Sequence, residues 1–343
     1  MAHPLLAPHA LLAWRDTDTL AVLDPLAPES TVTIGNATAD TVSWLRRCDG
    51  TRPEETVLAA AVDTGIDPGS ARAVLAALSE HGLLGHCEPG SLPRTEAHLR
   101  SPSLREAQAL ALGGSPGEQA LERRSGTLVA ITGADRVAHA LVDALSAARI
   151  GALQALGIGA GRRRVTLREV AVPGPAETDL GAQAQTALKR HIVRVHGSPP
   201  ARPRSPLVVA TGEYLDAGEE ALVRRLGVPY LSVLVSARTA VIGPLTLPGQ
   251  SACRECIEHT RAQVDPDWPA LLTQREHRRR EPTPVDGAFA LWVAALAAMH
   301  LLQVIDHDDP GPLVNTTLHI DRATRSVRRR TWAQHPACAC SWS

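Results

Sequence analysis

The pattern of apolar and polar residues changes twice along the chain. In the first ninety residues, short apolar runs broken by Asp and Pro predict strands at 10–14, 20–23 and 31–34. Helices are then predicted at 38–49, 53–65 and 68–82, because capping residues or Pro precede each apolar period and Gly follows it. Strands followed by three short helices are typical of a winged helix-turn-helix domain, which we place at residues 1–88.

Residues 89–125 and 126–343 have different patterns. The first stretch is rich in Pro, Gly, Ser, Arg and Glu and is interpreted as a linker with room for one polar helix. The second alternates strands with helices, and this alternation predicts an α/β domain with a mainly parallel, helix-covered, Rossmann-like sheet. Its strands are expected at 128–131, 152–158, 165–172, 207–210, 231–235 and 239–242.

Composition narrows the function classes. The 343 residues carry 35 Lys+Arg against 36 Asp+Glu, a net charge of -1, so no overall field favours nucleic acid or an anionic membrane. The aromatic content of 3% argues against a surface on which the bases of single-stranded nucleic acid would stack. No signal peptide or membrane-spanning run is evident, so a cytoplasmic protein is expected. Six cysteines are too few for a disulfide scaffold.

Cysteine spacing is the sharpest chemical signal. Cys253 and Cys256 form a C-x-x-C, and Cys338 and Cys340 form a C-x-C near the C-terminus. Four soft thiolates suit a closed, structural zinc site without an open position for water. The alternatives are a redox pair at the C-x-x-C or free thiols, and His259 or His335 could replace one ligand. Cys48 and Cys87 stand alone and are interpreted as buried or incidental.

The turn after the 128–131 strand lacks the signature of a nucleotide site. A dinucleotide-type turn has three glycines, whereas this one has Gly133 followed by Asp135, whose negative charge lies where phosphate would bind. We therefore predict a degenerate nucleotide loop and no ATP. Three arginine triplets are interpreted as solvated loop charges, with acidic peptide or nucleic acid as alternative ligands: 162–164, 278–280 and 328–330.

These motifs together resemble a known family. The motifs that carry the resemblance are Gly243-Pro244-Leu245, Pro248-Gly249, Cys253-x-x-Cys256, Asp265-Pro266-Asp267-Trp268-Pro269 and His335-Pro336-x-Cys338-x-Cys340. Through them the chain resembles the ThiF/MoeB-like proteins of thiazole/oxazole-modified peptide biosynthesis. The resemblance implies a partner of a YcaO cyclodehydratase that binds the leader of a ribosomally made precursor peptide through an N-terminal RiPP recognition element. Because the glycine loop is degenerate, it implies a non-catalytic scaffold with structural zinc.

The resemblance also implies where a leader peptide would bind. It would add as a strand to Thr31, Val32, Thr33 and Ile34 and pack against the third helix, at some of the residues Ala71, Arg72, Val74, Leu75 and Leu78. At least half of the apolar members are expected to be core, and Arg72 is the preferred contact for an acidic leader residue.

Two other functions stay open: an active adenylyltransferase for a sulfur-carrier or ubiquitin-like protein, and a winged-helix DNA-binding regulator. The third helix offers mainly Arg72 as a cation, which disfavours DNA. Proteins of this family commonly form homodimers, and the apolar segment 289–302 is a candidate core or interface.

Overall fold

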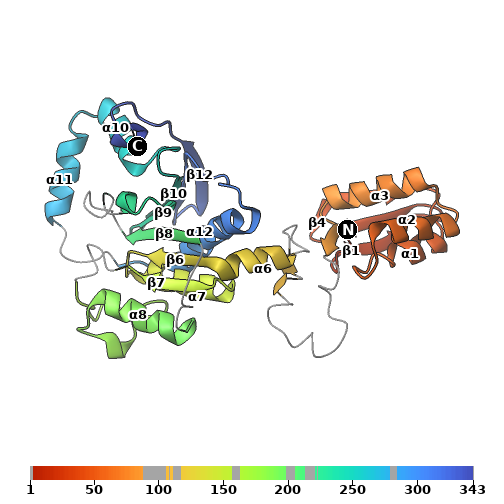
Figure 1. Cartoon of the computed structure of the whole chain (residues 1–343), viewed down its shortest axis with the longest axis horizontal. Helices are drawn as coiled ribbons and strands as arrows, with labels where there is room; N and C mark the ends of the chain where they lie inside the picture. The colour runs from red at the N-terminus through yellow and green to blue at the C-terminus, as the bar shows by residue number, and fades with distance from the viewer. Residues whose placement is uncertain are drawn as a thin grey trace. The chain divides into compact units, whose positions relative to one another are not determined.

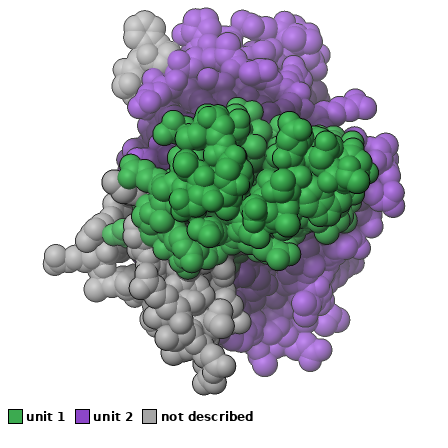
Figure 2. All heavy atoms as spheres, turned by 90° about the vertical axis from the view of Figure 1, so that its right-hand side faces the viewer, with its two compact units in different colours: residues 1–122 green, residues 123–343 purple. Residues whose placement is uncertain are grey.

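The chain folds into two compact units, residues 1–122 and 123–343, which Figure 2 colours separately. The computed structural model describes residues 3–87, 106–107, 109–110, 117–156, 163–197, 205–212, 221, 223–278 and 284–342.

Unit 1 contains two small antiparallel sheets. In one, β1 (His3–Leu6) pairs with β5 (Leu84–Cys87), which joins the first and last strands of the unit. The other has the order β2 (Leu11–Trp14), β3 (Leu20–Asp24), β4 (Ala27–Ile34), so β4 forms one edge of the described sheet. The sequence predicted β2, β3 and the end of β4 but not the pairing of β1 with β5.

Three helices cover the core of unit 1, at the positions the apolar periods predicted: α1 (Ala39–Leu45), α2 (Glu54–Asp63) and α3 (Pro68–Glu80). The side chain of Asp67 caps α3 by accepting a hydrogen bond from the Ser70 amide at 2.9 Å. Trp44 is fully buried between the elements, and its indole N–H donates to the Val57 carbonyl at 2.9 Å. The winged-helix interpretation of this unit stays a prediction.

Unit 2 is built on one seven-stranded sheet with the order β12-β11-β10-β9-β8-β6-β7 (Figure 1). Strands β7, β6, β8 and β9 are parallel neighbours, whereas β10, β11 and β12 continue the sheet in antiparallel pairs. The mainly parallel α/β sheet is therefore confirmed, with an antiparallel extension. The strand bounds are Thr127–Ile131 (β6), Ala152–Ala155 (β7), Ser205–Gly212 (β8), Tyr230–Val235 (β9), Thr239–Thr246 (β10), Thr316–Asp321 (β11) and Ser326–Thr331 (β12).

Two expectations for this unit were wrong: a strand at residues 165–172, and a loop position for the arginines 328–330. Residues 165–172 are turns and bends rather than a strand. The arginines 328–330 belong to β12, not to a loop, and Arg163 and Arg164 bond to the Ala134 and Gly181 carbonyls at 3.1 and 2.7 Å. Arg162, Arg279 and Arg280 lie outside the described residues, while Arg278 ends a helix.

The end of the expected linker is a helix, as the sequence interpretation allowed. α6 (Gly117–Gly126) runs directly into β6. Its Arg124 is buried and forms a two-pronged ion pair with Asp306, both nitrogen–oxygen distances being 2.7 Å. Helix propensity and a buried partner far along the chain outweigh the Gly- and Ser-rich composition of the region.

The remaining helices cover the sheet or extend from it: α7 (Arg136–Ala147), α8 (Ala184–Val195), α10 (Arg254–Val264), α11 (Trp268–Arg278) and α12 (Gly287–His307), with short 3₁₀ turns at Glu177–Asp179 and Ala339–Trp342. α12 is long and apolar enough to cross a membrane by length and composition. Its side chains Phe289, Val293, Ala297 and Leu301 are nevertheless buried in the core of unit 2.

Candidate metal centre and ligand surfaces

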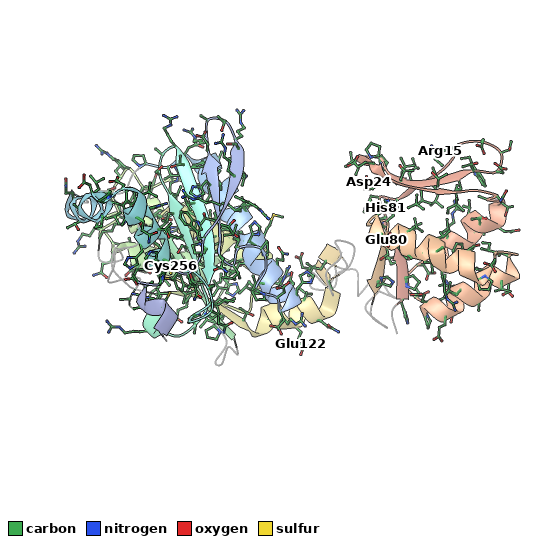
Figure 3. All side chains as sticks on the ribbon, turned by 90° about the horizontal axis from the view of Figure 1, so that it is seen from above. Arg15, Asp24, Glu80, His81, Glu122 and Cys256 are labelled. Atoms are coloured by element: carbon green, nitrogen blue, oxygen red, sulfur yellow. The ribbon has the colours of Figure 1, made fainter. Side chains whose placement is uncertain are left out.

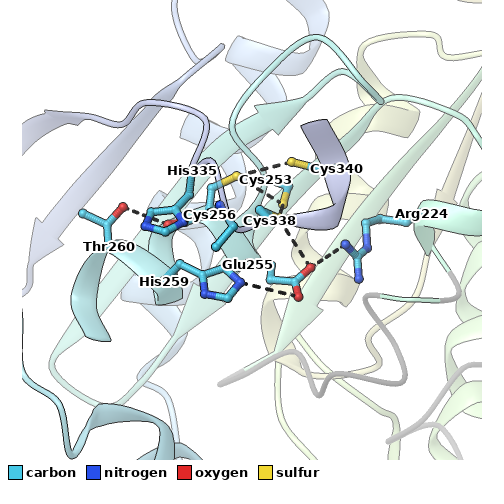
Figure 4. Close-up of polar contacts among 10 residues, drawn as sticks. Arg224, Cys253, Glu255, Cys256, His259, Thr260, His335, Cys338 and Cys340 are labelled. Atoms are coloured by element: carbon cyan, nitrogen blue, oxygen red, sulfur yellow. Dashed lines mark hydrogen bonds and ion pairs between the residues drawn. The ribbon is translucent and has the colours of Figure 1, made fainter. Parts of the chain in front are cut away.

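The four predicted cysteine ligands converge although more than eighty residues separate the two pairs (Figure 4). Cys253 is the N-cap of α10 and Cys256 lies in its first turn. The chain end carrying Cys338 and Cys340 returns beside α10 (Figure 1). The preceding loop is held in place because the Asn315 side chain accepts a hydrogen bond from the Ala252 amide at 2.7 Å.

The sulfur geometry fits a tetrahedral metal site. The Sγ–Sγ distances are 3.8 Å for Cys253–Cys256, 3.6 Å for Cys253–Cys338 and 3.3 Å for Cys256–Cys340, and all four sulfurs lie within 4.8 Å of one another. Zinc bonded to four thiolates at about 2.3 Å places the sulfurs about 3.8 Å apart. A disulfide needs about 2.05 Å, so these thiols are not paired covalently. All four side chains are buried, and the arrangement is compatible with a structural zinc ion.

Charged and aromatic groups surround the cysteines. Glu255 accepts a hydrogen bond from Arg224 at 2.5 Å, and its Oε2 also accepts from the Cys338 thiol at 3.5 Å. The His259 ring stacks on His335 with centroids 5.0 Å apart, and its Nε2 lies 3.8 Å from Oε1 of Glu255. The two histidines therefore lie beside the four cysteines, and His259 also belongs to a second possible ligand group, with Glu255 and Cys338. Burial opposes ionisation of Cys256, but the backbone N–H groups of His335 and Cys253 lower the pKa of this thiol overall.

The loop at Gly133, which the sequence analysis predicts to be a degenerate nucleotide site, is filled by the chain's own groups. A Cβ built on Gly133 would lie 1.9 Å from Oγ1 of Thr211, so β6 and β8 approach each other too closely for any other residue. The Asp135 carboxylate caps α7 by accepting from the Ala138 amide at 2.7 Å. This amide is one of the donors that a helix N-terminus offers to phosphate. Burial raises the pKa of Asp135 despite this hydrogen bond.

The predicted groove residues of unit 1 divide into core and surface. Thr31 is half-buried, Thr33 is exposed and Ile34 is half-buried on the edge strand β4. Arg72 is exposed on α3 and Val74 is half-buried. The other predicted contacts are buried in the core of this unit and cannot meet a ligand without rearrangement: Val32, Ala71, Leu75 and Leu78.

Figure 3 marks Cys256 in unit 2, and Glu80 and His81 where α3 of unit 1 ends. Cys48 is buried in the core of unit 1, as expected, and the side chain of Cys87 lies outside the described set. The sequence motifs did not predict a role for Glu255 or Arg224 at this site. The sequence shows Glu255 as a charged residue inside the C-x-x-C. Its ion pair with Arg224 depends on the packing of α10, and no pattern in the neighbouring sequence predicts it.

Comparison with known proteins places the fold but not the family. No protein-family description matches the chain, and no curated protein sequence matches it. The structure is similar to E. coli MccB solved with ATP, with a TM-score of 0.72 and 16% identity over 99% of this chain and 100% of MccB. It is also similar to the microcin C7 biosynthetic enzyme MccB in complex with N-formylated MccA, with a TM-score of 0.70, 15% identity, and coverage of 99% and 100%. The heterocyclase TruD matches with a TM-score of 0.58 and 15% identity over 99% of this chain but 43% of TruD. The chain therefore has the fold of MccB, a ThiF/MoeB-like fold, from end to end.

Proposed function

We propose that this protein binds the leader region of a ribosomally made precursor peptide and presents it to a YcaO-type cyclodehydratase for azoline formation, without adenylating chemistry of its own. The observation that carries the proposal is that the similarity to MccB extends over both units, and MccB has been solved in complex with MccA. Coverage of unit 1 matters because the predicted leader groove lies there.

The surface of unit 1 has the chemistry that strand addition requires. The outer edge of β4 has no strand partner among the described residues, so its backbone groups are available to an extended peptide. Pro28 lies in β4, and proline is confined to edge strands because it has no N–H to donate. Beside this edge, Arg72 would pair with an acidic leader residue, while the half-buried Val74 and Ile34 supply apolar contact.

The binding test uses candidate precursors from the gene's own neighbourhood. Peptides encoded by short, Cys/Ser/Thr-rich reading frames flanking the gene are synthesised with a fluorophore, and binding is followed by fluorescence anisotropy. Arg72→Glu is expected to weaken binding at least about tenfold, because the new charge repels an acidic leader residue. Arg47→Glu, an exposed arginine on the turn after α1, is the matched control and should leave the affinity within twofold. Equal affinity of Arg72→Glu and the wild type would place the peptide elsewhere.

Adenylation is the second candidate, because MccB has also been solved with ATP over the same length of chain. The self-capped helix at Asp135 and the Gly133–Thr211 contact weigh against a phosphate site here. ATP–pyrophosphate exchange in the presence of the bound peptide distinguishes the two. We expect exchange at the rate of a protein-free blank; exchange stimulated by the peptide would make the protein an enzyme.

A further inference from the structure

A polar cavity of about 200 Å³ lies in unit 2, between α10 and one face of the antiparallel strands β9, β10 and β11. This space is enough for one side chain or a small organic acid. The residues that decide its chemistry are Ser232, Arg254, Glu258, Arg261, His319 and Trp332. The cavity lies next to the cysteine cluster, with whose small core it shares Ile257 and Trp332, and it does not include the loop at Gly133.

Strand register explains why these groups meet. Val241 of β10 lies opposite Leu234 of β9 and His319 of β11, so the three side chains form one row across the sheet. Further along, Thr317 lies opposite Arg330 of β12, which places Arg330 on the same face. The facing helix α10 contributes Arg254, Glu258 and Arg261, spaced four and three residues apart and therefore on one side of the helix.

The cavity and its rim carry more positive than negative charge. The guanidinium of Arg261 lies 5.8 Å from the Trp332 ring centroid, and that of Arg330 lies 4.1 Å from the same centroid. Glu258 is the carboxylate among the lining residues, and it accepts hydrogen bonds from Arg254 at 3.1 Å, from the Trp268 indole at 2.5 Å and, more weakly, from Arg261 at 3.4 Å. Burial, together with the charges of Arg261 and Arg330, lowers the pKa of His319. The cavity and its rim thus hold three guanidinium groups, those of Arg254, Arg261 and Arg330, and one carboxylate, which pairs with the first two.

A buried hydroxyl points to a ligand independently of charge. Ser232 lines the cavity and is only 1% exposed, yet its Oγ has no hydrogen-bond partner among the described residues. Burying a hydroxyl without a partner is unfavourable, because the group loses its hydrogen bonds to water, so such groups are uncommon in folded proteins. The wall beside Ser232 is apolar, formed by Leu234, Val241 and Ile257.

We propose that this cavity binds a carboxylate at the end of a short aliphatic chain, such as a glutamate side chain of a peptide or a free dicarboxylic acid. The guanidinium groups of Arg261 and Arg254 donate hydrogen bonds to the carboxylate oxygens, and the Ser232 hydroxyl donates another. The apolar wall contacts the methylene groups. The site is set by α10, whose first turn the cysteine cluster holds. It stands whether or not unit 1 binds a leader peptide.

Titration by nuclear magnetic resonance tests the ligand class on the full chain. The probes are glutarate, the capped peptide acetyl-Gly-Glu-Gly-amide, its Gln analogue and inorganic phosphate. Glutarate should shift the Arg261 Nε–H and Ser232 amide signals saturably if the natural ligand is a free dicarboxylic acid, and the Glu peptide should do so if it is a peptide side chain. The Gln analogue should bind at least about tenfold more weakly, because it lacks the charge. Saturable binding of phosphate without either carboxylate would overturn the assignment, as would equal binding of the Glu and Gln peptides.

Variants locate the binding in the cavity. Arg261→Gln should weaken carboxylate binding at least about tenfold, and Ser232→Ala should weaken it severalfold with little change of volume. Arg329→Gln is the matched control, because Arg329 lies opposite the buried Leu318 and so on the other face of β12. This control should bind within twofold of the wild type. An equal loss in Arg329→Gln, or undiminished binding in both Arg261→Gln and Ser232→Ala, would rule the cavity out.

Discussion

At the residue scale, Gly133 is required by packing, because Thr211 lies too close to leave room for a side chain. We predict that Gly133→Ala destabilises the protein by about 1–3 kcal/mol, because the new methyl group would lie 1.9 Å from Oγ1 and 2.3 Å from the backbone oxygen of Thr211. Urea unfolding measures the change. Gly126→Ala is the control, since a Cβ there meets nothing within 4 Å, and it should change stability by less than about 1 kcal/mol. Equal stability of the two variants would contradict the close approach.

Cys48 is the residue for which burial makes a pH-dependent prediction. Burial raises the pKa of this thiol from its ordinary value of 9.0 to about 12. Since the folded state disfavours the thiolate, the stabilising effect is complete below pH 9 and is lost as the pH rises from 9 toward 12, with a slope of up to about 1.4 kcal/mol per pH unit. Chemical unfolding of the wild type and Cys48→Ala between pH 8 and 11 should show a smaller slope in the variant. Parallel curves would mean that this thiol ionises as freely in the folded protein as in the unfolded chain.

At the element scale, α10 connects the cysteine cluster to the carboxylate cavity. Its N-cap and first turn carry Cys253 and Cys256, and the face made by Arg254, Glu258 and Arg261 lines the cavity. Loss of one thiolate leaves an incomplete tetrahedral set, so we predict that Cys340→Ser purifies with much less than one zinc per chain. Elemental analysis after dialysis measures the content. Cys48→Ala, a change in the other unit, should retain one zinc per chain. Full zinc in Cys340→Ser would remove Cys340 from the ligand set.

Elements with local signals were predictable from the sequence, and elements that depend on distant partners were not. α3 was predicted because Asp67 and Pro68 begin an apolar period that ends at Gly82. β12 was missed because its three arginines alternate between the two faces of an exposed edge strand and show no apolar period. β1 was missed because its partner β5 lies some eighty residues away, and only that pairing makes it a strand.

The candidate sites divide in the same way. Cysteine is uncommon, so two close pairs indicated a metal centre without knowledge of the fold. The cavity beside α10 could not be predicted, because it depends on the register of three strands and on an unpaired hydroxyl at Ser232. The groove of unit 1 is intermediate. Its edge strand was predicted, but burial assigns Val32 and Leu75 to the core, and alternation of side chains alone could not decide that.

At the scale of the whole molecule, each unit has its own hydrophobic core. The core of unit 1 is centred on Trp44 and Leu78, and that of unit 2 on residues of β6, α7 and α12 such as Ile131, Leu141 and Val293. The cysteine cluster belongs to unit 2 and packs with Trp332 and Ile257 in a small core of its own. Separate cores predict that the two units unfold as separate cooperative transitions.

Metal removal should therefore affect one unit and leave the other unchanged. Binding of a structural zinc ion contributes about 10–16 kcal/mol to the folding of small zinc domains. Since 1 kcal/mol corresponds to about 2–4 °C for a domain of this size, a strong chelator should lower the Tm of unit 2 by about 10 °C or more. The transition of unit 1, identified by its loss of stability in Cys48→Ala, should stay within about 1 °C. Differential scanning calorimetry with and without chelator measures both. An unchanged thermogram would show that the four cysteines hold no metal on which folding depends, and a shift of both transitions together would show that the two units unfold as one.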